Sequence, residues 1–559
     1  MTGTASLLTG FGTILPAVLC SALTGVFIQS LALPRRMNGV KRHWHLPLQL
    51  ALLAFLAAFI FLILGKILFS CTGAALLVLA LTVISNAKYR SLREPLVFSD
   101  YDYFTDAFRF PRLYFPFLGI SGALGLVLAA GMAILGWELE DYSENHWSLY
   151  GDLPVIALIM SVSGAIIALS GKKLRDSLLQ DPGTDLAGHG FIPMLYGYCL
   201  LYLKTPAAVS PFAAESGQVR SAGRLPDLIA VQSESFFDPR KLCPGIRGDL
   251  FGTFDRISSE ASATGLMQVP SWGANTIRTE FSFLTGIAPE LMGGHRFSPY
   301  QISSRSWQVA SLTSFLKKQG YRTVCIHPFY AGFYHRNIIF KKWGFDEFQD
   351  IRSFAGIPAD PEKSGPYIPD AALFERVIAR YRELINESRD PVFIFVITME
   401  NHGPLNLEHI TPEHAQRYFE EGALRSGLSG KAMTELAIYL RHLENENAVL
   451  ERLIGFLNSQ DREAVLTFYG DHVPILTETY GVFGDPPGLV PYFIWQNRKF
   501  RETEGGKEGV KAAPEAPTEN PEQKAADVPG MRASELAMRT AEIMGFEFRQ
   551  SIGNSGDCQ

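Results

Sequence analysis

Cysteine and charged residues are scarce in this sequence, and each shortage excludes a class of protein. Six cysteines in 559 residues are too few for a fold built on disulfides, and no two have zinc-ligand spacing. Lys, Arg, Asp and Glu make up only 19% of the chain, and the first 34 residues contain none of them. The net charge of −6 argues against a dedicated nucleic-acid-binding protein, which is usually basic. The composition instead indicates a membrane protein.

Long charge-free apolar segments fill the first third of the chain. A helix needs about 20 apolar residues to cross the hydrocarbon core of a membrane. Five segments meet this requirement: Phe11–Leu33, Leu46–Gly65, Ile67–Ala87, Leu113–Trp137 and Leu153–Gly171. A sixth stretch, Leu186–Leu203, contains Gly, Pro and His, so we predict an interfacial helix there rather than a sixth span. The expected organisation is a transmembrane bundle over residues 1–175 and an interfacial helix with a linker over residues 176–224.

The charged loops between the predicted spans leave the orientation open. Basic residues gather in Arg35–Arg42 and Lys88–Arg112, whereas Glu138–Asp152 contains acidic residues and no Lys or Arg. The positive-inside rule places the basic loops in the cytoplasm. The rest of the chain would then be cytoplasmic with five spans and extracytoplasmic with six. The Lys88–Arg112 segment mixes aromatic residues with both charge signs, which fits either an interfacial segment or a solvated loop.

From Leu225 onward, short apolar runs alternate with helical patterns. Strands are predicted at Asp227–Gln232, Tyr321–Ile326, Val392–Thr398, Ala464–Tyr469 and Tyr492–Trp495. Helices are predicted at Ser306–Gln319, Asp370–Asn386, Met433–Asn458 and Ala533–Gly545. This alternation indicates an α/β domain with a mainly parallel sheet over residues 225–559. Residues 501–532, rich in Glu, Lys, Pro and Gly, are predicted to be a disordered insertion in it.

Polar side chains follow four of the predicted strands. They are Glu234, His327, His402 and the pair Asp471 and His472. Ligands of open α/β sheets bind at the carboxyl ends of the strands, so we expect these side chains to converge. Glu234, Asp471 and His472 combine two carboxylates with an imidazole, a set suited to Mn²⁺, Mg²⁺ or Zn²⁺.

Thr276 is the candidate nucleophile. It follows a Gly-Ala-Asn turn at the predicted start of a helix. A hydroxyl in that position lies in the positive field of the helix N-terminus, and a bound metal would lower its pKa further. The alternative is that Thr276 only caps the helix.

Four motifs together resemble the lipoteichoic acid synthase type of phosphoglycerol transferase, in the alkaline phosphatase/sulfatase superfamily. They are ESFFD at Glu234, NTIRTEF at Thr276, NHGP at His402 and YGDH at Asp471–His472. The segment from His327 to Asn337 is similar to a further block of that family. The resemblance implies a metal ion, usually Mn²⁺, held by Glu234, Thr276, Asp471 and His472. It implies that phosphoglycerol contacts His327, Tyr334, Arg336 and His402.

This sequence departs from the family pattern at several positions. Tyr334 stands where the synthases carry Trp, His335 stands where they carry Asn, and Ile-Arg-Thr follows Thr276 in place of Ser-Asp-Ser. These differences leave the predicted metal ligands intact. They bear on the identity of the acceptor and of the donor.

The family implies a two-step transfer. Thr276 attacks phosphatidylglycerol or a related lipid, and a glycan or polymer hydroxyl then takes the phosphoglycerol group, with His402 as the proton shuttle. The family also implies a multi-pass protein of the cell (inner) membrane, with five spans and an extracytoplasmic catalytic domain. We adopt this orientation although it contradicts the charge count, because such an enzyme acts on lipid head groups of the outer leaflet.

Three other functions remain open at this point. A sulfatase or phosphodiesterase could use the same scaffold, but the nearest match to the sulfatase Cys-x-Pro-x-Arg motif, at Cys243–Arg247, has its Pro one place early. A phosphoethanolamine transferase would usually add zinc ligands and disulfides. A non-catalytic partner in envelope polymer assembly would not need the complete set of predicted metal ligands.

Overall fold

The structure is a computed structural model. It describes residues 2–35, 37, 46–140, 151–213, 218–219, 225–359, 364–421, 428, 430–504 and 530–548. The chain forms two compact units. The first contains Met1–Thr205 together with Gly293–Phe297, and the second contains Pro206–Met292 and Ser298–Gln559.

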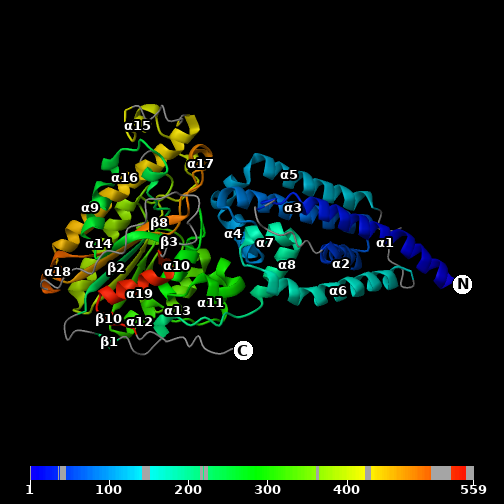
Figure 1. Cartoon of the computed structure of the whole chain (residues 1–559), viewed down its shortest axis with the longest axis horizontal. Helices are drawn as coiled ribbons and strands as arrows, with labels where there is room; N and C mark the ends of the chain where they lie inside the picture. Colours follow the sequence, from blue (N-terminus) through cyan, green and yellow to red (C-terminus); the bar gives the residue numbers. More distant parts are fainter. Residues whose placement is uncertain are drawn as a thin grey trace. The chain divides into compact units, whose positions relative to one another are not determined.

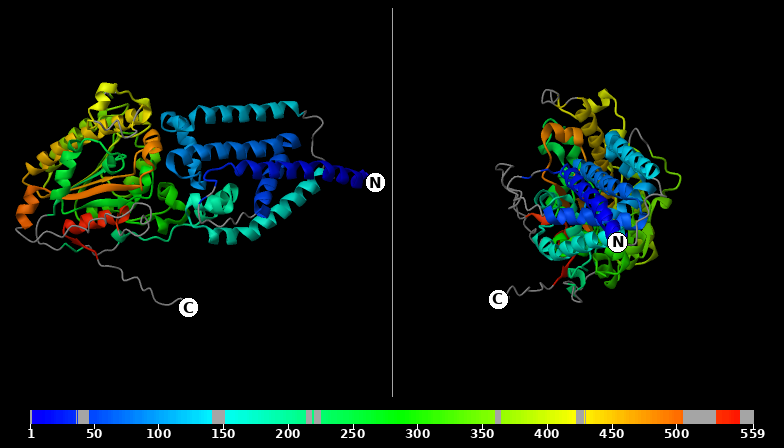
Figure 2. Two further views of the ribbon diagram at one scale, coloured as in Figure 1. Left: turned by 45° about the horizontal axis from the view of Figure 1, so that its top comes forward. Right: turned by 90° about the vertical axis from the view of Figure 1, so that its right-hand side faces the viewer.

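The first unit contains five helices that are long and apolar enough to cross a membrane, as predicted. They are α1 (Thr2–Gln29), α2 (Leu46–Leu64), α3 (Ile67–Leu92), α5 (Pro111–Leu139) and α6 (Asp152–Ser177). Helix α3 packs against both α1 and α5, and the three run side by side in Figure 2. Most of their apolar surface is left exposed within the unit, as expected of side chains that face lipid.

The predicted helix over Leu186–Leu203 is two short helices instead of one. Helix α7 (Pro182–His189) ends at Gly190, whose φ of 92° breaks the helix, and α8 (Phe191–Tyr202) follows. The 12 residues of α8 are too few to span a membrane, so the count of five spans holds. A buried amide pair braces the break, because Gln29 accepts a hydrogen bond from Ile192 N at 2.9 Å and donates to Gln49 at 2.9 Å.

The Lys88–Arg112 segment is folded rather than an open loop. Helix α3 continues to Leu92, and η1 (Phe98–Asp100) and α4 (Tyr101–Arg109) follow. Lys88 forms ion pairs with Glu94 at 2.7 Å and with Asp100 at 2.6 Å. These contacts close the segment on itself.

The second unit is built on an eight-stranded sheet with the order β5-β4-β6-β2-β7-β8-β3-β9. Only β8 runs antiparallel to its neighbours, so the predicted mainly parallel sheet is confirmed. The predicted strands correspond to β2 (Asp227–Ser233), β4 (Arg322–Ile326), β6 (Val392–Ile397), β7 (Ala464–Gly470) and β8 (Leu489–Gln496). The strands of this sheet that were not predicted are β3 (Ala263–Gln268), β5 (Glu347–Gln349) and β9 (Met531–Arg532), and β1 (Gln218–Val219) and β10 (Phe546–Glu547) form a separate two-stranded sheet that was not predicted either.

Helices cover both faces of the sheet (Figure 1). One layer contains α9 (Gly252–Glu260), α14 (Asp370–Glu387) and α16 (Gly430–Asn458), and the other contains α10 (Thr276–Thr285), α12 (Leu312–Lys318) and α19 (Ala533–Ile543). Strands β2, β6 and β7 are buried along their whole length because helices cover them on both sides.

Several predicted bounds in the second unit differ from those of the structure. The helix predicted from Ser306 begins six residues later, because the Ser311 hydroxyl caps α12 by accepting from Ser314 N at 3.1 Å. The insertion predicted over residues 501–532 overlaps α18 (Arg498–Glu504) and β9 at its two ends. Residues 505–529 of that insertion lie outside the described residues.

Candidate active site and metal centre

Strands β2 and β7 bring the predicted metal ligands together. The two strands are parallel neighbours with Ser233 opposite Gly470, so the residues that follow them leave the sheet at the same level. One ligand atom each from Glu234, Asp471 and His472 lies within 4.8 Å of the others, and all three residues are buried. His472 Nε2 is 3.6 Å from Glu234 Oε1 and 3.3 Å from Asp471 Oδ2.

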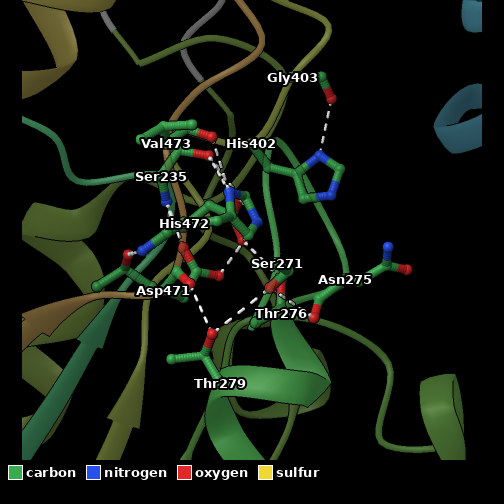
Figure 3. Close-up of polar contacts among 12 residues, drawn as sticks. Ser235, Ser271, Asn275, Thr276, Thr279, His402, Gly403, Asp471, His472 and Val473 are labelled. Atoms are coloured by element: carbon green, nitrogen blue, oxygen red, sulfur yellow. Dashed lines mark hydrogen bonds and ion pairs between the residues drawn. The ribbon is translucent and has the colours of Figure 1, made fainter. Parts of the chain in front are cut away.

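Ser235 holds the two carboxylates in place, and the sequence analysis missed it. Its backbone N–H donates to Asp471 Oδ1 at 2.8 Å, and its hydroxyl donates to Glu234 Oε1 at 2.9 Å. Its φ of 55° turns the chain sharply after Glu234, and Tyr439 fixes this turn by donating to Ser235 O at 2.8 Å. The contacts of Ser235 with Asp471 and His472 are visible in Figure 3.

The cluster fits a divalent metal ion. Asp471 Oδ2 and His472 Nε2 are buried and have no hydrogen-bond partner among the described residues. Burial, together with the nearby Glu234 carboxylate, raises the pKa of Asp471 to about 7. Burying two carboxylates beside the lone pair of an imidazole costs free energy unless a cation lies between them. Carboxylate oxygens and an imidazole nitrogen are also common ligands of divalent metal ions.

Thr276 lies beside this cluster at the start of α10. Its Oγ1 is 3.3 Å from Glu234 Oε2. Asn275, with φ of 66°, occupies the N-cap position, so the alternative that Thr276 caps the helix is wrong. Thr279, one turn later, donates to Asp471 O at 2.7 Å and fixes the helix to the end of β7 (Figure 3).

His327 and Arg336 form a second buried group. His327 follows β4, and Arg336 begins α13 (Arg336–Lys342). Arg336 Nη1 is 3.3 Å from His327 Nε2, and burial and the Arg336 charge hold the pKa of His327 well below its ordinary value. The Tyr334 ring lies 5.3 Å from the guanidinium carbon. Both Tyr334 and the next residue, His335, have positive φ, so the chain is tightly bent here.

His402 comes after β6, and Figure 3 draws it with Thr276 and His472. Its Nδ1 is 2.7 Å from Gly403 O. A carbonyl oxygen can only accept, so Nδ1 carries the proton of the neutral ring and Nε2 has a lone pair. This is the protonation state that a general base requires.

A group of buried acids lies behind the site, and no residue pattern predicts it. Glu446 on α16 accepts a hydrogen bond from the Ser233 hydroxyl, and Asp370 N at the start of α14 donates to Glu400 at 2.7 Å. Burial raises the pKa of Glu446 from 4.5 to about 8, and the nearby Glu400 carboxylate adds to the increase. The raised pKa favours the protonated form of Glu446 in the folded protein at neutral pH.

The pH dependence of stability should change when Glu446 is replaced by Gln. Glu446 binds its proton more tightly in the folded protein, so its contribution to stability is complete below pH 4.5 and is lost as the pH rises through about 8. A Glu446→Gln variant does not lose this stability as the pH rises. The melting temperature of the variant minus that of the wild type should therefore be larger at pH 9 than at pH 5. Melting curves at both pH values test this, with Glu451→Gln on the exposed side of α16 as control. If the difference in melting temperature between variant and wild type were the same at pH 5 and pH 9, the pKa of Glu446 would not be raised in the folded protein.

Comparison with known proteins identifies the family. The family model for sulfatases matches residues 226–520, which is more than half of the chain. The chain belongs to the sulfatase family. The predicted superfamily is thus confirmed, and the metal-dependent character of that superfamily agrees with the cluster at Glu234.

Three proteins illustrate the range of relatives. The capsular polysaccharide biosynthesis protein RkpI of Rhizobium meliloti is 28% identical over 477 residues, or 80% of each chain. A putative cyclic β-1,2-glucan modification protein of the same organism is 30% identical over 295 residues, or 52% of this chain and 41% of the relative. The lipooligosaccharide phosphoethanolamine transferase EptA of Neisseria meningitidis covers 96% of both chains with a TM-score of 0.56 and 15% identity. EptA therefore shares the whole fold, including the membrane bundle.

Proposed function

We propose that the protein is a membrane-bound, metal-dependent transferase that moves phosphoglycerol from phosphatidylglycerol to a glycan of the cell envelope. The observation that carries the proposal is the position of the Thr276 hydroxyl, 3.3 Å from Glu234 within the cluster of metal-ligand type. A hydroxyl nucleophile suits transfer of a phosphoryl group. The formylglycine sulfatases use a modified cysteine instead, and Cys243 is a buried residue of another segment.

The motifs at Glu234, Thr276, His402 and Asp471 support phosphoglycerol as the transferred group, because together they resemble the lipoteichoic acid synthase family. The relatives support a glycan acceptor, since one is named for capsular polysaccharide biosynthesis and another for cyclic glucan modification. The shared fold of EptA makes phosphoethanolamine the second candidate for the transferred group. A lipid donor in the outer leaflet favours an extracytoplasmic catalytic unit.

In the first step, Thr276 Oγ attacks the phosphorus and the bond to the diacylglycerol oxygen breaks. His402 Nε2 takes the proton of the attacking hydroxyl and returns it to the departing oxygen, so diacylglycerol leaves and a phosphoglycerol–threonine ester remains. In the second step, a hydroxyl of the glycan gives its proton to His402 and forms a new bond to phosphorus. The bond between phosphorus and Thr276 Oγ breaks, and His402 returns the proton to Thr276 Oγ. Arg336 donates hydrogen bonds to the phosphoryl oxygens.

A divalent cation, which we propose to be Mn²⁺, would be held by Glu234, Asp471, His472 and the Thr276 hydroxyl. When bound, such an ion lowers the pKa of a hydroxyl and offsets negative charge on phosphoryl oxygens. Binding of Mn²⁺ by the purified protein would also separate an enzyme from a non-catalytic partner, since the latter need not bind the ion.

The test is lipid cleavage by the purified full-length protein. We expect release of diacylglycerol from fluorescent phosphatidylglycerol with Mn²⁺, and transfer of labelled glycerol phosphate to an added cyclic glucan. Cleavage of phosphatidylethanolamine in its place would make the protein a phosphoethanolamine transferase. Cleavage of an aryl sulfate alone would overturn the transferase proposal.

A further inference from the structure

Glu280 is a buried carboxylate that the reaction described above does not use. It lies on α10 four residues after Thr276, on the same face of the helix, and it is fully buried. Its Oε1 accepts hydrogen bonds from Tyr300 Oη at 2.5 Å and from Arg336 Nε at 3.0 Å. Its Oε2 accepts from Arg336 Nη2 at 2.7 Å and from Gln232 Nε2 at 3.4 Å. The helix that carries the nucleophile is thus joined to Arg336 through one carboxylate.

The hydrogen bonds of Arg336 can be counted. A guanidinium has five N–H groups, one on Nε and two on each Nη. Glu280 takes the N–H of Nε and one on Nη2. His327 Nδ1 is 3.1 Å from Ile397 O, so Nδ1 donates to this carbonyl and Nε2 is free to accept one N–H from Arg336 Nη1, 3.3 Å away. One N–H on Nη1 and one on Nη2 are left without a partner among the residues that the structure describes.

The charges of this group balance without a substrate. Arg336 is 2% exposed and Glu280 is 0% exposed, so each would be a buried unpaired charge without the other. Side-on pairing through Nε and Nη2 fixes the plane of the guanidinium, and the Tyr334 ring lies 5.3 Å from its carbon. The two remaining N–H groups therefore have a fixed direction. N–H groups held in the plane of a guanidinium are suited to donating to the oxygens of a phosphoryl group.

We propose that Glu280 is the positioning residue that orients Arg336 toward the transferred phosphoryl group and couples this orientation to the helix of the nucleophile. His327 helps to hold Arg336 in this orientation. Its Nε2 accepts from Arg336 Nη1, and its Nδ1 donates to Ile397 O. This inference rests on the proposed phosphoryl transfer. It does not depend on which head group the donor lipid carries.

The first test is Glu280→Gln, which keeps the size of the side chain and removes its charge. The amide nitrogen of Gln cannot accept from Arg336, so the guanidinium loses its fixed direction. We expect kcat/KM for the lipid donor to fall about 100-fold, mainly in kcat. Tyr300→Phe is the matched control, because it removes a different hydrogen bond to the same carboxylate and leaves Arg336 paired; its activity should stay within about 3-fold of the wild type.

A double-mutant cycle separates positioning from a purely structural role. If Glu280 acts through Arg336, Glu280→Gln should have no further effect on kcat in an Arg336→Met background. Equal losses in both backgrounds would overturn the proposal. Glu280→Asp keeps the charge, so it should recover at least part of kcat, and a Glu280→Asp variant as inactive as Glu280→Gln would also count against it.

Ligand binding separates this inference from the proposed function. Binding of glycerol phosphate, measured by calorimetry in the presence of Mn²⁺, should be about 10-fold weaker for Glu280→Gln, whereas Mn²⁺ binding measured alone should be unchanged. That result would support the inference even if phosphatidylglycerol is not the donor. Wild-type glycerol phosphate binding by a Glu280→Gln variant that also retains wild-type kcat would overturn it.

Discussion

Replacing Thr276 by alanine should abolish diacylglycerol release and leave the fold intact. In the proposed mechanism this hydroxyl forms the bond to phosphorus, and the hydroxyl of Thr279 one turn later is not available to replace it, since it already donates to Asp471 O. We expect turnover to fall on the order of 10⁴-fold or more. The contact between Thr276 Oγ1 and Glu234 Oε2 is long, at 3.3 Å, so the melting temperature should change little when it is lost.

The measurement is fluorescent phosphatidylglycerol cleavage by wild type, Thr276→Ala and Thr276→Ser. The serine variant keeps a hydroxyl at the same place and should retain activity between those of the other two. Intact-protein mass spectrometry without acceptor should find one added phosphoglycerol group on the wild type and none on Thr276→Ala. Turnover by the alanine variant at the wild-type rate would exclude Thr276 as the nucleophile.

The candidate metal ligands Glu234, Asp471 and His472 could be predicted because these residues follow strands. Glu234 and Asp471 come directly after buried apolar runs, and parallel strands place their carboxyl ends at one edge of the sheet. The order of the strands did not have to be known in detail. That β2 and β7 are direct neighbours, which brings the ligand atoms within reach of one another, is known only from the structure.

Ser235 and Glu280 could not be recognised in the same way. The role of Ser235 depends on a positive φ and on backbone contacts to Asp471, and no residue pattern encodes these. Glu280 stands in the NTIRTEF motif, but its partner Arg336 is 56 residues away. Glu446 becomes an unusual acid only because α16 buries it behind β2. Each of these depends on tertiary contacts.

Strand length explains the missed parts of the sheet. Strand β5 has three residues and β9 has two, which is too short for an alternating pattern to appear. Strand β3 contains Gly265 and several exposed residues, so it has neither the buried run nor the β-branched composition of β2. The apolar spans were easier, because a helix in lipid needs about 20 apolar residues whatever its neighbours are.

Replacing Asp471 by Asn should remove metal binding and yet stabilise the metal-free protein. In the wild type, Asp471 Oδ1 accepts from Ser235 N at 2.8 Å. Its Oδ2 is 3.3 Å from His472 Nε2 and has no hydrogen-bond partner in the described part of the chain. An asparagine can keep the first contact through its carbonyl oxygen and donate its amide N–H to the imidazole. It also removes the repulsion between two buried carboxylates, because Glu234 becomes the single charge in the cluster.

Melting curves in EDTA and in Mn²⁺ test both parts of this expectation. In EDTA the melting temperature of Asp471→Asn should exceed that of the wild type. Added Mn²⁺ should stabilise the wild type, by about 2.7 kcal/mol at 100 times its dissociation constant, and should leave the variant unchanged. Lipid cleavage should be lost with the metal. Asp249→Asn, in an exposed ion pair with Arg247, is the control for loss of one acid. If Mn²⁺ stabilised Asp471→Asn as strongly as the wild type, the ion would bind elsewhere in the protein. Binding at the cluster of Glu234, Asp471 and His472 should weaken when one of its ligands is removed.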